Sequence, residues 1–310
     1  MNLNRSKISV LLALFFTAII LYGCVGEDPD NLIRHDLTFE FTKNSERIDL
    51  FPAEVTALDV YVFNSEGIYV ANFKDKHIDH GVKTYRLPLR LPFGEYTFVV
   101  WGGEMDSFAT ERMKLGTSTL KEAQLILKQQ GTTVDYQVEN LYYGRADHIT
   151  LMQGSSTATH ISLTKNTHLL NLTVKGLTPA LSLAQHVYAA VVCTASNGQF
   201  NFDNSLSASS PTIQYKAFAR SESDDEFIAK LSVLRLLPNL DCRLIVKNTT
   251  TGEDMFNENL MDLIMQLPPI NSAKDLDRQY DFDVVIILNS ILGVTVTING
   301  YVVVEAEQDI

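Results

Sequence analysis

The chain has 310 residues, of which 45% are hydrophobic and 20% charged, and its formal net charge is −12 at pH 7. This hydrophobic content excludes an intrinsically disordered chain. The acidic balance, with no basic run interleaved with aromatic residues, argues against a nucleic-acid partner. The sequence lacks a Gly-x-Ser-x-Gly elbow, a phosphate-binding glycine loop and a His-Glu-x-x-His pair. We therefore expect no enzyme and no bound cofactor, in a chain long enough for two domains.

The first 23 residues have the order of a secretory signal peptide. Arg5 and Lys7 form a short basic head. Residues 8–21 form an apolar run of about 14 residues, shorter than the roughly 18 needed to span a bilayer permanently. Residues 21–24, Leu-Tyr-Gly-Cys, resemble a bacterial lipobox, which implies cleavage before Cys24 and acyl chains, such as palmitate, on that residue. The alternative is an ordinary signal peptide cut nearby, with Cys24 incidental.

An acidic tether is expected at residues 24–35. Three acids, Glu27, Asp28 and Asp30, lie close to the proposed lipid site, which resembles the surface-export signal of lipoproteins in the Bacteroidota. A solvated linker is the alternative. Without the signal peptide the chain has 23 basic and 37 acidic residues, a net charge of about −14. A body with this much negative charge gains nothing from an anionic membrane surface. The lipid would therefore provide the anchoring.

Short alternating strands between residues 36 and 154 predict an N-terminal β-sandwich. Leu37, Phe39 and Phe41 alternate with polar residues, which is the pattern of a half-buried strand over residues 36–42. Further strands are expected at residues 58–63, 68–73, 85–91 and 95–101. Pro88 cannot donate a hydrogen bond to a neighbouring strand, so its strand is expected at a sheet edge.

A small polar run at residues 154–157 suggests a domain boundary, and residues 155–310 are expected to form a second β-sandwich domain. Its strands restart at residues 160–163 and 170–174 and continue to residues 302–305. Asn299-Gly300, between β-branched runs, predicts a type I′ hairpin. One convincing helix is expected at residues 259–267, because apolar residues recur there at helical spacing and Asn259 can cap it.

Two groups of titratable residues are candidate metal sites. The denser group comprises Asp75, His77, Asp79 and His80. The other is the acidic stretch at residues 221–226. Histidine and carboxylate side chains bind zinc, and carboxylates bind calcium, but the second group lacks the ligand spacing of an EF-hand. Positions between strands favour solvated loops, so the sequence predicts no metal site.

Two cysteines remain in the mature chain, Cys193 and Cys242, and each lies in an apolar run with strand character. An exported protein can join two such residues as a disulfide. Two buried thiols that pack as small hydrophobic residues are the other possibility. Sequence gives no distance between the two, so both stay open.

Several short motifs, taken in their order along the chain, resemble those of a known family. The motifs are the strand at residues 58–64, the turn at Gly67, residues 94–103, Leu141 to Gly144, Asp277-Arg278, and the Asn299-Gly300 hairpin. In this order they resemble the FimB-like fimbrial anchor lipoprotein family of the type V fimbriae of the Bacteroidota. The resemblance covers nearly the whole mature chain. It implies a mainly all-β protein with two tandem transthyretin-like β-sandwich domains and one short helix in the C-terminal domain.

The resemblance also implies a function. It suggests a surface subunit, anchored by lipid on Cys24, that attaches a fimbria to the outer membrane and limits its length. Its partners would be fimbrial stalk subunits, joined by β-strand complementation, in which main-chain hydrogen bonds supply the affinity. Stalk precursors of the family are cut after a basic residue near the N-terminus, and Arg34 is the candidate here. An arginine that is merely part of the tether is the simpler interpretation.

Two other functions stay open at this point. A mature N-terminus at His35 would indicate a stalk subunit or a tip adhesin. The other is a surface lipoprotein that binds a glycan or a host protein. Tyr61, Tyr69, Tyr142 and Tyr143 could form a platform on which sugars stack, although aromatic residues on strands more often pack in a core.

Overall fold

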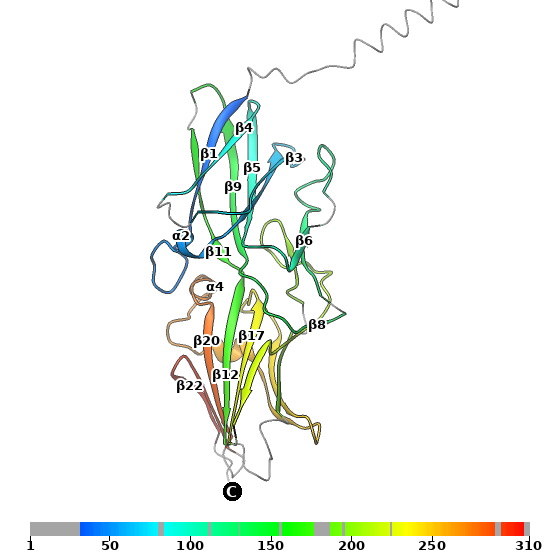
Figure 1. Ribbon diagram of the computed structural model, residues 1–310, viewed down its shortest axis with the longest axis vertical. Coiled ribbons are helices and arrows are strands. Elements are labelled where there is room, and N and C mark those ends of the chain that lie inside the picture. Colours follow the sequence, from blue (N-terminus) through cyan, green and yellow to red (C-terminus); the bar gives the residue numbers. More distant parts are fainter. Residues whose placement is uncertain are drawn as a thin grey trace, which may run out of the picture.

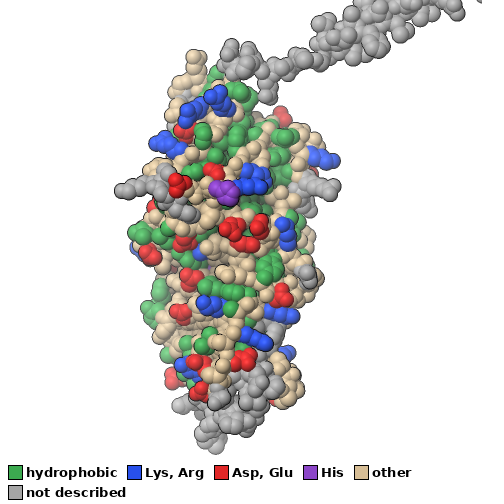
Figure 2. Space-filling model, in the orientation of Figure 1, with side chains coloured by type: hydrophobic (Ala, Val, Ile, Leu, Met, Phe, Trp, Pro, Cys, Tyr) green, Lys and Arg blue, Asp and Glu red, His purple; other side chains and the backbone are tan. Residues whose placement is uncertain are grey.

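The computed structural model describes residues 32–79, 84–110, 113–129, 131–154, 157–176, 187–193, 196–223, 225–288 and 293–306. The molecule is elongated, with two β-sandwiches arranged one after the other along its long axis (Figures 1 and 2). Strands dominate, which confirms the predicted mainly all-β class. The described helices are α2 (Phe51–Glu54), α3 (Leu260–Ile264) and α4 (Ala273–Leu276). None of them is long and apolar enough to cross a bilayer.

The N-terminal sandwich consists of two facing sheets. The three-stranded sheet has the order β10-β1-β4 and comprises β1 (Ile33–Glu40), β4 (Arg86–Leu91) and β10 (Ala158–Ser162). The five-stranded sheet has the order β11-β9-β5-β2-β3. It comprises β2 (Leu58–Asn64), β3 (Tyr69–Asp75), β5 (Gly94–Gly102), β9 (Tyr142–Leu151) and β11 (Thr164–Lys165).

Alternation of apolar and polar residues explains how these sheets face each other. Leu37 and Phe39 of β1 are buried while the residues between them lie nearer the surface. They share one core with Val60 of β2 and Phe98 of β5. In the described sheet β4 pairs with β1 alone, so the edge position predicted from Pro88 is confirmed.

The C-terminal sandwich is larger. One sheet has the order β16-β17-β12-β20-β21-β22 and comprises β12 (Thr167–Lys175), β16 (Ala219–Glu222), β17 (Glu226–Leu234), β20 (Asp281–Leu288), β21 (Val294–Ile298) and β22 (Tyr301–Ala306). The other has the order β19-β18-β13-β15-β8 and comprises β8 (Thr133–Val134), β13 (Val187–Cys193), β15 (Ile213–Lys216), β18 (Cys242–Asn248) and β19 (Asp254–Asn259).

Two local predictions for this half are confirmed. Asn299 and Gly300 join β21 to β22 with φ values of 49° and 81°, as a type I′ turn requires. The expected helix is present as α3, although it ends at Ile264 rather than at residue 267, and the Asn259 side chain accepts hydrogen bonds from the amides of Met261 and Asp262. These bonds satisfy two of the donors that a helix start leaves unpaired. The structure adds α2 and α4, which are single turns too short for a hydrophobic period to reveal.

Strands that cross between the sandwiches join them. β7 (Gln124–Leu127) pairs with β6 (Phe108–Thr110) and with β14 (Gln199–Asn201), which gives a third, small sheet. β8 pairs in parallel with β15 of the C-terminal half. The larger core contains Tyr61 and Trp101 from the five-stranded sheet together with Leu170 and Phe282 from the C-terminal sandwich. The two halves therefore share buried apolar surface rather than meeting only through a linker.

Strand pairing favours a later division between the halves than residue 154. β10 pairs with β1, and β11 pairs with β9, so both strands extend the N-terminal sandwich. β12 pairs with β17 and β20 of the C-terminal sandwich. We therefore propose Asn166, the residue between β11 and β12, as the division. The polar run at residues 154–157 precedes β10 inside the N-terminal half, and loops share the composition of linkers.

Candidate functional site: the junction between the two sandwiches

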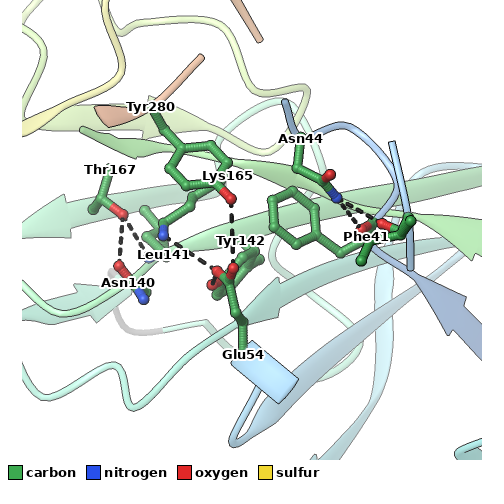
Figure 3. Close-up of polar contacts among 10 residues, drawn as sticks. Phe41, Asn44, Glu54, Asn140, Leu141, Tyr142, Lys165, Thr167 and Tyr280 are labelled. Atoms are coloured by element: carbon green, nitrogen blue, oxygen red, sulfur yellow. Dashed lines mark hydrogen bonds and ion pairs between the residues drawn. The ribbon is translucent and has the colours of Figure 1, made fainter. Parts of the chain in front are cut away.

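Lys165, the last residue of β11, is at the centre of the junction. Its ammonium group lies 4.2 Å from the centre of the Tyr280 ring and 5.8 Å from the centre of the Tyr142 ring (Figure 3). Only 10% of the Lys165 side chain is exposed, and loss of water strengthens the attraction of a cation to ring faces. Tyr142 begins β9 and Tyr280 directly precedes β20. Lys165 thus connects the two sandwiches.

Glu54, the last residue of α2, supplies the opposite charge. Its carboxylate accepts a 2.7 Å hydrogen bond from the Tyr142 hydroxyl and a 3.4 Å bond from the Tyr280 hydroxyl (Figure 3). It also lies 3.3 Å from Lys165 Nζ. Phe51 anchors α2 in the N-terminal core, which holds Glu54 in place. Because Tyr142 belongs to one sandwich and Tyr280 to the other, this carboxylate joins both halves. Hydrogen bonds to an ionised group are stronger than neutral ones.

Burial keeps both tyrosines protonated. Desolvation raises the pKa of Tyr142 and of Tyr280 well above the usual value for tyrosine, and the negative charge of Glu54 adds to the effect. Both hydroxyls therefore donate to Glu54 at physiological pH. General acid–base catalysis needs a group that titrates near the working pH. The cluster is thus suited to holding the two halves together rather than to moving protons.

A second set of polar contacts crosses the junction near residues 202–204. The Tyr143 hydroxyl donates to the Phe202 carbonyl at 3.0 Å, and the Asn166 side chain donates to Asn204 Oδ1 at 2.6 Å. Burial raises the pKa of Tyr143 to about 12, so this hydroxyl also remains a donor. Asn166 and Asn204 are buried. Buried polar groups that satisfy each other favour one arrangement over others that leave them unpaired.

The Asp277-Arg278 motif lies at this junction too. Asp277 accepts a 2.7 Å hydrogen bond from Arg235, within the C-terminal sandwich. Arg278 donates to the Thr42 carbonyl at 3.1 Å, so it reaches the segment directly after β1. Asp277 therefore stabilises the C-terminal half, and Arg278 contacts the N-terminal half.

His168 of β12 is the buried titratable group beside these contacts. It is 4% exposed and stacks on Phe282, with 6.0 Å between ring centres. Burial, together with the positive charges of Arg235 and Lys165, lowers its pKa to about 3. The ring is therefore neutral at pH 7, and protonating it would add a third cation to a desolvated region.

Two glycines of the sequence motifs allow close packing around the junction. Gly103 has a φ of 107°, and a Cβ there would lie 1.9 Å from the Asn140 carbonyl oxygen. A Cβ on Gly144 would lie 2.6 Å from side-chain atoms of Ile161 and Leu163. Both motifs therefore need glycine because other chain segments occupy the space that a side chain would fill.

The N-terminal candidates have different outcomes. Cys24 lies outside the described residues, so its lipidation stays a prediction. Arg34 was expected in the tether before the first strand, but it lies within β1, where its exposed side chain contacts Asp36 at 3.4 Å. The strand starts at Ile33 rather than residue 36. The sequence concealed this start because the inward position before Leu37 is taken by His35, which bonds Thr159 at 2.8 Å.

In the described residues, the titratable clusters form hydrogen bonds within turns. Asp75 accepts a hydrogen bond from the Tyr85 hydroxyl at 2.6 Å and another from the His77 amide at 3.0 Å. His80 lies outside the described residues. In the stretch 221–226, the Ser223 amide bonds the Glu226 carbonyl and closes the hairpin between β16 and β17. Among the described residues, no three His, Cys, Asp or Glu side chains are grouped to hold a metal.

The tyrosines considered as a sugar platform are buried. The exposed fraction is 4% for Tyr61, 7% for Tyr69, 0% for Tyr142 and 9% for Tyr143. The Tyr61 ring packs against Phe202 of the C-terminal half at 5.0 Å between ring centres. The platform interpretation is therefore wrong, because side chains from elsewhere in the chain cover both faces of the five-stranded sheet.

Cys193 and Cys242 occupy opposite positions on neighbouring strands. β13 and β18 are antiparallel, and their register pairs these two residues directly. The Cα atoms of directly opposed residues are about 4.5–5.5 Å apart. That spacing lies within the roughly 4.4–6.8 Å that a disulfide needs. The backbone register is therefore compatible with the disulfide that the sequence leaves open.

Comparison with known proteins identifies the family. A family profile described as fimbrillin-A associated anchor proteins Mfa1 and Mfa2 matches residues 34–307. The chain belongs to this family. The match runs from β1 to just beyond β22, so it covers both sandwiches and the junction. The family consists of structural anchor subunits of fimbriae, not of enzymes.

Individual relatives are consistent with this assignment. The minor fimbrium anchoring subunit Mfa2 of Porphyromonas gingivalis is 27% identical over 225 residues, which cover 69% of this chain and 66% of that protein, just under two thirds of its length. The solved structure of Mfa2 from Porphyromonas gingivalis has a TM-score of 0.72 at 21% identity, with 88% of this chain and 99% of that chain covered. A candidate polysaccharide-binding protein from Bacteroides thetaiotaomicron has a TM-score of 0.78 at 22% identity, with 89% and 98% covered. These structures support the β-sandwich fold.

Proposed function

We propose that this protein is a lipid-anchored subunit that attaches a fimbria to the outer membrane, limits its length and joins the stalk by β-strand complementation. Acyl chains on Cys24 would hold it in the membrane. One acyl chain anchors only marginally, because each buried methylene adds about 0.8 kcal/mol, so lasting retention takes more than one chain. Membership in the anchor family supports the general role.

The position of β1 is the observation that carries the proposal. The strand begins nine residues after Cys24 and is the middle strand of its sheet. It pairs in parallel with β10 over five residue pairs and in antiparallel with β4 over six. Tension on the tether would act along β1, so the hydrogen bonds on both sides must break together before the strand leaves. A central first strand therefore suits a subunit that is pulled from its N-terminus.

The register of β1 also bears on Arg34 as a processing site. Cleavage after Arg34 would detach Ile33 and Arg34 but leave residues 36–40 paired with β10, and Leu37 and Phe39 in the core. Such a cut would not open a groove for a strand from another subunit. We therefore expect the mature protein to begin at acylated Cys24. A mature N-terminus at His35 would support a stalk or tip subunit instead.

A retained first strand offers a physical reason for a limit on length. A subunit whose N-terminal sheet is already filled has no vacant position for a donated strand, so the polymer would end where it is incorporated. At the other end of the chain, β22 is an edge strand on which Tyr301 is 44% exposed and Val302 is 59% exposed. An edge strand with exposed apolar side chains suits donation to a neighbouring subunit. We propose β22 as the donated strand.

Deleting the gene tests the proposed function. We expect long fimbriae to be shed into the medium, whereas cells with unchanged, attached fimbriae would contradict the anchoring role. Complementation with Cys24→Ala should leave the fimbriae detached, because the lipid site is lost. Complementation with Val25→Ala, one residue further along, should restore attachment. Glycan binding by the purified protein, with no fimbrial subunits bound to it, would favour a carbohydrate-binding lipoprotein.

A further inference from the structure

The end of the molecule at which β1 begins carries an unusual arrangement of charges. Arg34 of β1 lies directly opposite Arg90 of β4. Asp36 contacts Arg34 at 3.4 Å and Arg86 at 3.9 Å, so one carboxylate serves two of three arginines. Like charges directly opposite on neighbouring strands destabilise a sheet. The pair Arg34–Arg90 would therefore gain from an anion outside the folded chain.

Exposed apolar side chains lie at the same end. Phe93, between β4 and β5, is 49% exposed, and Met152, directly after β9, is 54% exposed. They are close because Gly94, which follows Phe93, pairs with Leu151, which precedes Met152. Figure 2 shows basic and hydrophobic side chains at the end of the molecule where Figure 1 places the start of β1. The tip surface is defined as Arg34, Arg86, Arg90, Phe93 and Met152.

The charge of this surface differs from that of the chain as a whole. Asp36 contacts two of the three arginines, and Glu95 of β5 follows the turn after β4. His148 partly neutralises the charge of Glu95. Its ring lies 2.7 Å from the carboxylate, and this contact raises the pKa of His148. The tip surface is thus locally basic on a chain whose net charge is −12. A whole-chain charge conceals such a patch.

We propose that the tip surface docks on the anionic headgroups of the membrane that holds the protein. The docked state would place Phe93 and Met152 at the upper part of the acyl chains. This proposal rests on the proposed lipid at Cys24. Eight residues separate Cys24 from Ile33, and a chain spans at most about 3.6 Å per residue, so the tip surface lies within about 30 Å of the headgroups.

The acidic tether is the competing occupant of the arginines. Its acids, Glu27, Asp28 and Asp30, could neutralise them, but they give no reason for exposed apolar side chains beside the arginines. A membrane interface accounts for both, because it binds basic side chains through its anionic headgroups and takes up aromatic side chains at its boundary. Docking would also direct the long axis of the molecule away from the membrane, since the tip surface is at one end of it (Figure 1).

Quenching of tryptophan emission by labelled lipids tests the docking. The purified acylated protein is reconstituted in vesicles of phosphatidylcholine and phosphatidylglycerol that contain a lipid with a nitroxide near the top of its acyl chain. The variant Phe93→Trp is compared with Leu115→Trp, which changes a 65% exposed residue between β6 and β7. The native Trp101 is fully buried and gives a constant background. We expect strong quenching of the first variant and little of the second.

Charge variants sharpen the test. Adding Arg34→Gln and Arg90→Gln to Phe93→Trp should lower the ratio of docked to undocked protein about fivefold per arginine in anionic vesicles. The same two changes remove a repulsive pair, so stability in solution should not fall. Equal quenching of the Phe93→Trp and Leu115→Trp variants would overturn the proposal. So would quenching that appears only after the three tether acids are replaced by amides, because the tether would then be the occupant.

The outcomes for the lipid and for the tip surface can be separated. Mass spectrometry of the purified protein reports whether Cys24 is acylated, and an unmodified Cys24 contradicts the proposed function. In that case the chain is coupled through Cys24 to a maleimide lipid in the same vesicles, and the quenching is measured again. Absence of quenching in an anchored Phe93→Trp protein contradicts the docking, whichever way the anchor was made.

Discussion

β1 and β22 are the first and last described strands, and they occupy opposite kinds of position. β1 is paired on both sides, and Leu37 and Phe39 insert into the N-terminal core with exposed fractions of 0% and 5%. Among the described strands β22 pairs with β21 alone, and its first two side chains, Tyr301 and Val302, are 44% and 59% exposed. The comparison shows that one end of the chain is built into the fold while the other is added to its edge.

This difference separates two tasks that an anchor combines. A strand that transmits tension from a tether must be costly to remove, which requires hydrogen bonds on both sides and buried side chains. A strand that is offered to a partner must be available, which requires an open edge. The junction between the sandwiches lies between these two strands, so the contacts of Lys165 and Glu54 would transmit tension from one half to the other.

The largest expected effect comes from weakening β1. Phe39→Ala should lower the free energy of unfolding by about 4 kcal/mol, because a buried aromatic side chain is lost and a cavity remains in the core. Chemical denaturation monitored by circular dichroism measures this change. Val302→Ala on β22 is the matched control, since its side chain is mostly exposed. Equal destabilisation by both changes would remove the distinction between the two strands.

A pH titration tests the junction through His168. Its pKa of about 3 in the folded state lies below the usual value of about 6.5. The unfolded chain therefore binds the proton first as pH falls. The contribution of neutral His168 to the free energy of unfolding is complete above pH 6.5 and is lost progressively toward pH 3. The loss should be about 3 kcal/mol at pH 4.5. Denaturation midpoints measured between pH 7 and 4.5 report it.

Two variants identify the histidine responsible. His168→Gln should flatten the decline in stability between pH 6.5 and 4.5, because the titrating group is gone. His148→Gln should leave the decline in place, since His148 is exposed and its pKa is raised rather than lowered by Glu95. A decline that persists in His168→Gln would show that another group governs the acid sensitivity.

A smaller effect is expected from the carboxylate at the junction. Glu54→Gln keeps the shape of the side chain but removes the charge that accepts from Tyr142, Tyr280 and Lys165. Hydrogen bonds to charged groups contribute more than neutral ones, so stability should fall by about 2 kcal/mol. Glu66→Gln, in the exposed turn between β2 and β3, is the control and should change stability little. No difference between the two variants would argue that the cluster does not hold the halves together.

Local signals predicted much of the strand pattern. The alternation around Leu37 and Phe39, the edge proline Pro88 and the Asn299-Gly300 turn each depend on residues close together in the sequence, and each is confirmed. The Asn259 cap is of the same kind. Such features are decided by backbone preferences and by the period of side chains along a single strand or helix.

Features that depend on distant residues leave no local signal in the sequence. Glu54 and Lys165 are 111 positions apart, and neither has a local pattern that marks it as a partner of the other. The four tyrosines look like a possible surface platform until the covering residues from other segments are known. β10 and β11 follow a linker-like run, yet they pair with β1 and β9. No local rule predicts which strand a segment pairs with across such distances.

The smallest effect on stability is expected at β22, where the effect on assembly should be large. Val302→Asp should change the free energy of unfolding by less than about 0.5 kcal/mol, because the side chain is exposed at a sheet edge. A charge on an edge strand opposes pairing with another chain, so fewer fimbriae should remain attached to cells. Leu115→Asp, an equally polar change at an exposed site away from β22, should leave attachment unchanged. Normal attachment in Val302→Asp cells would exclude β22 as the donated strand and favour another open edge, such as β16.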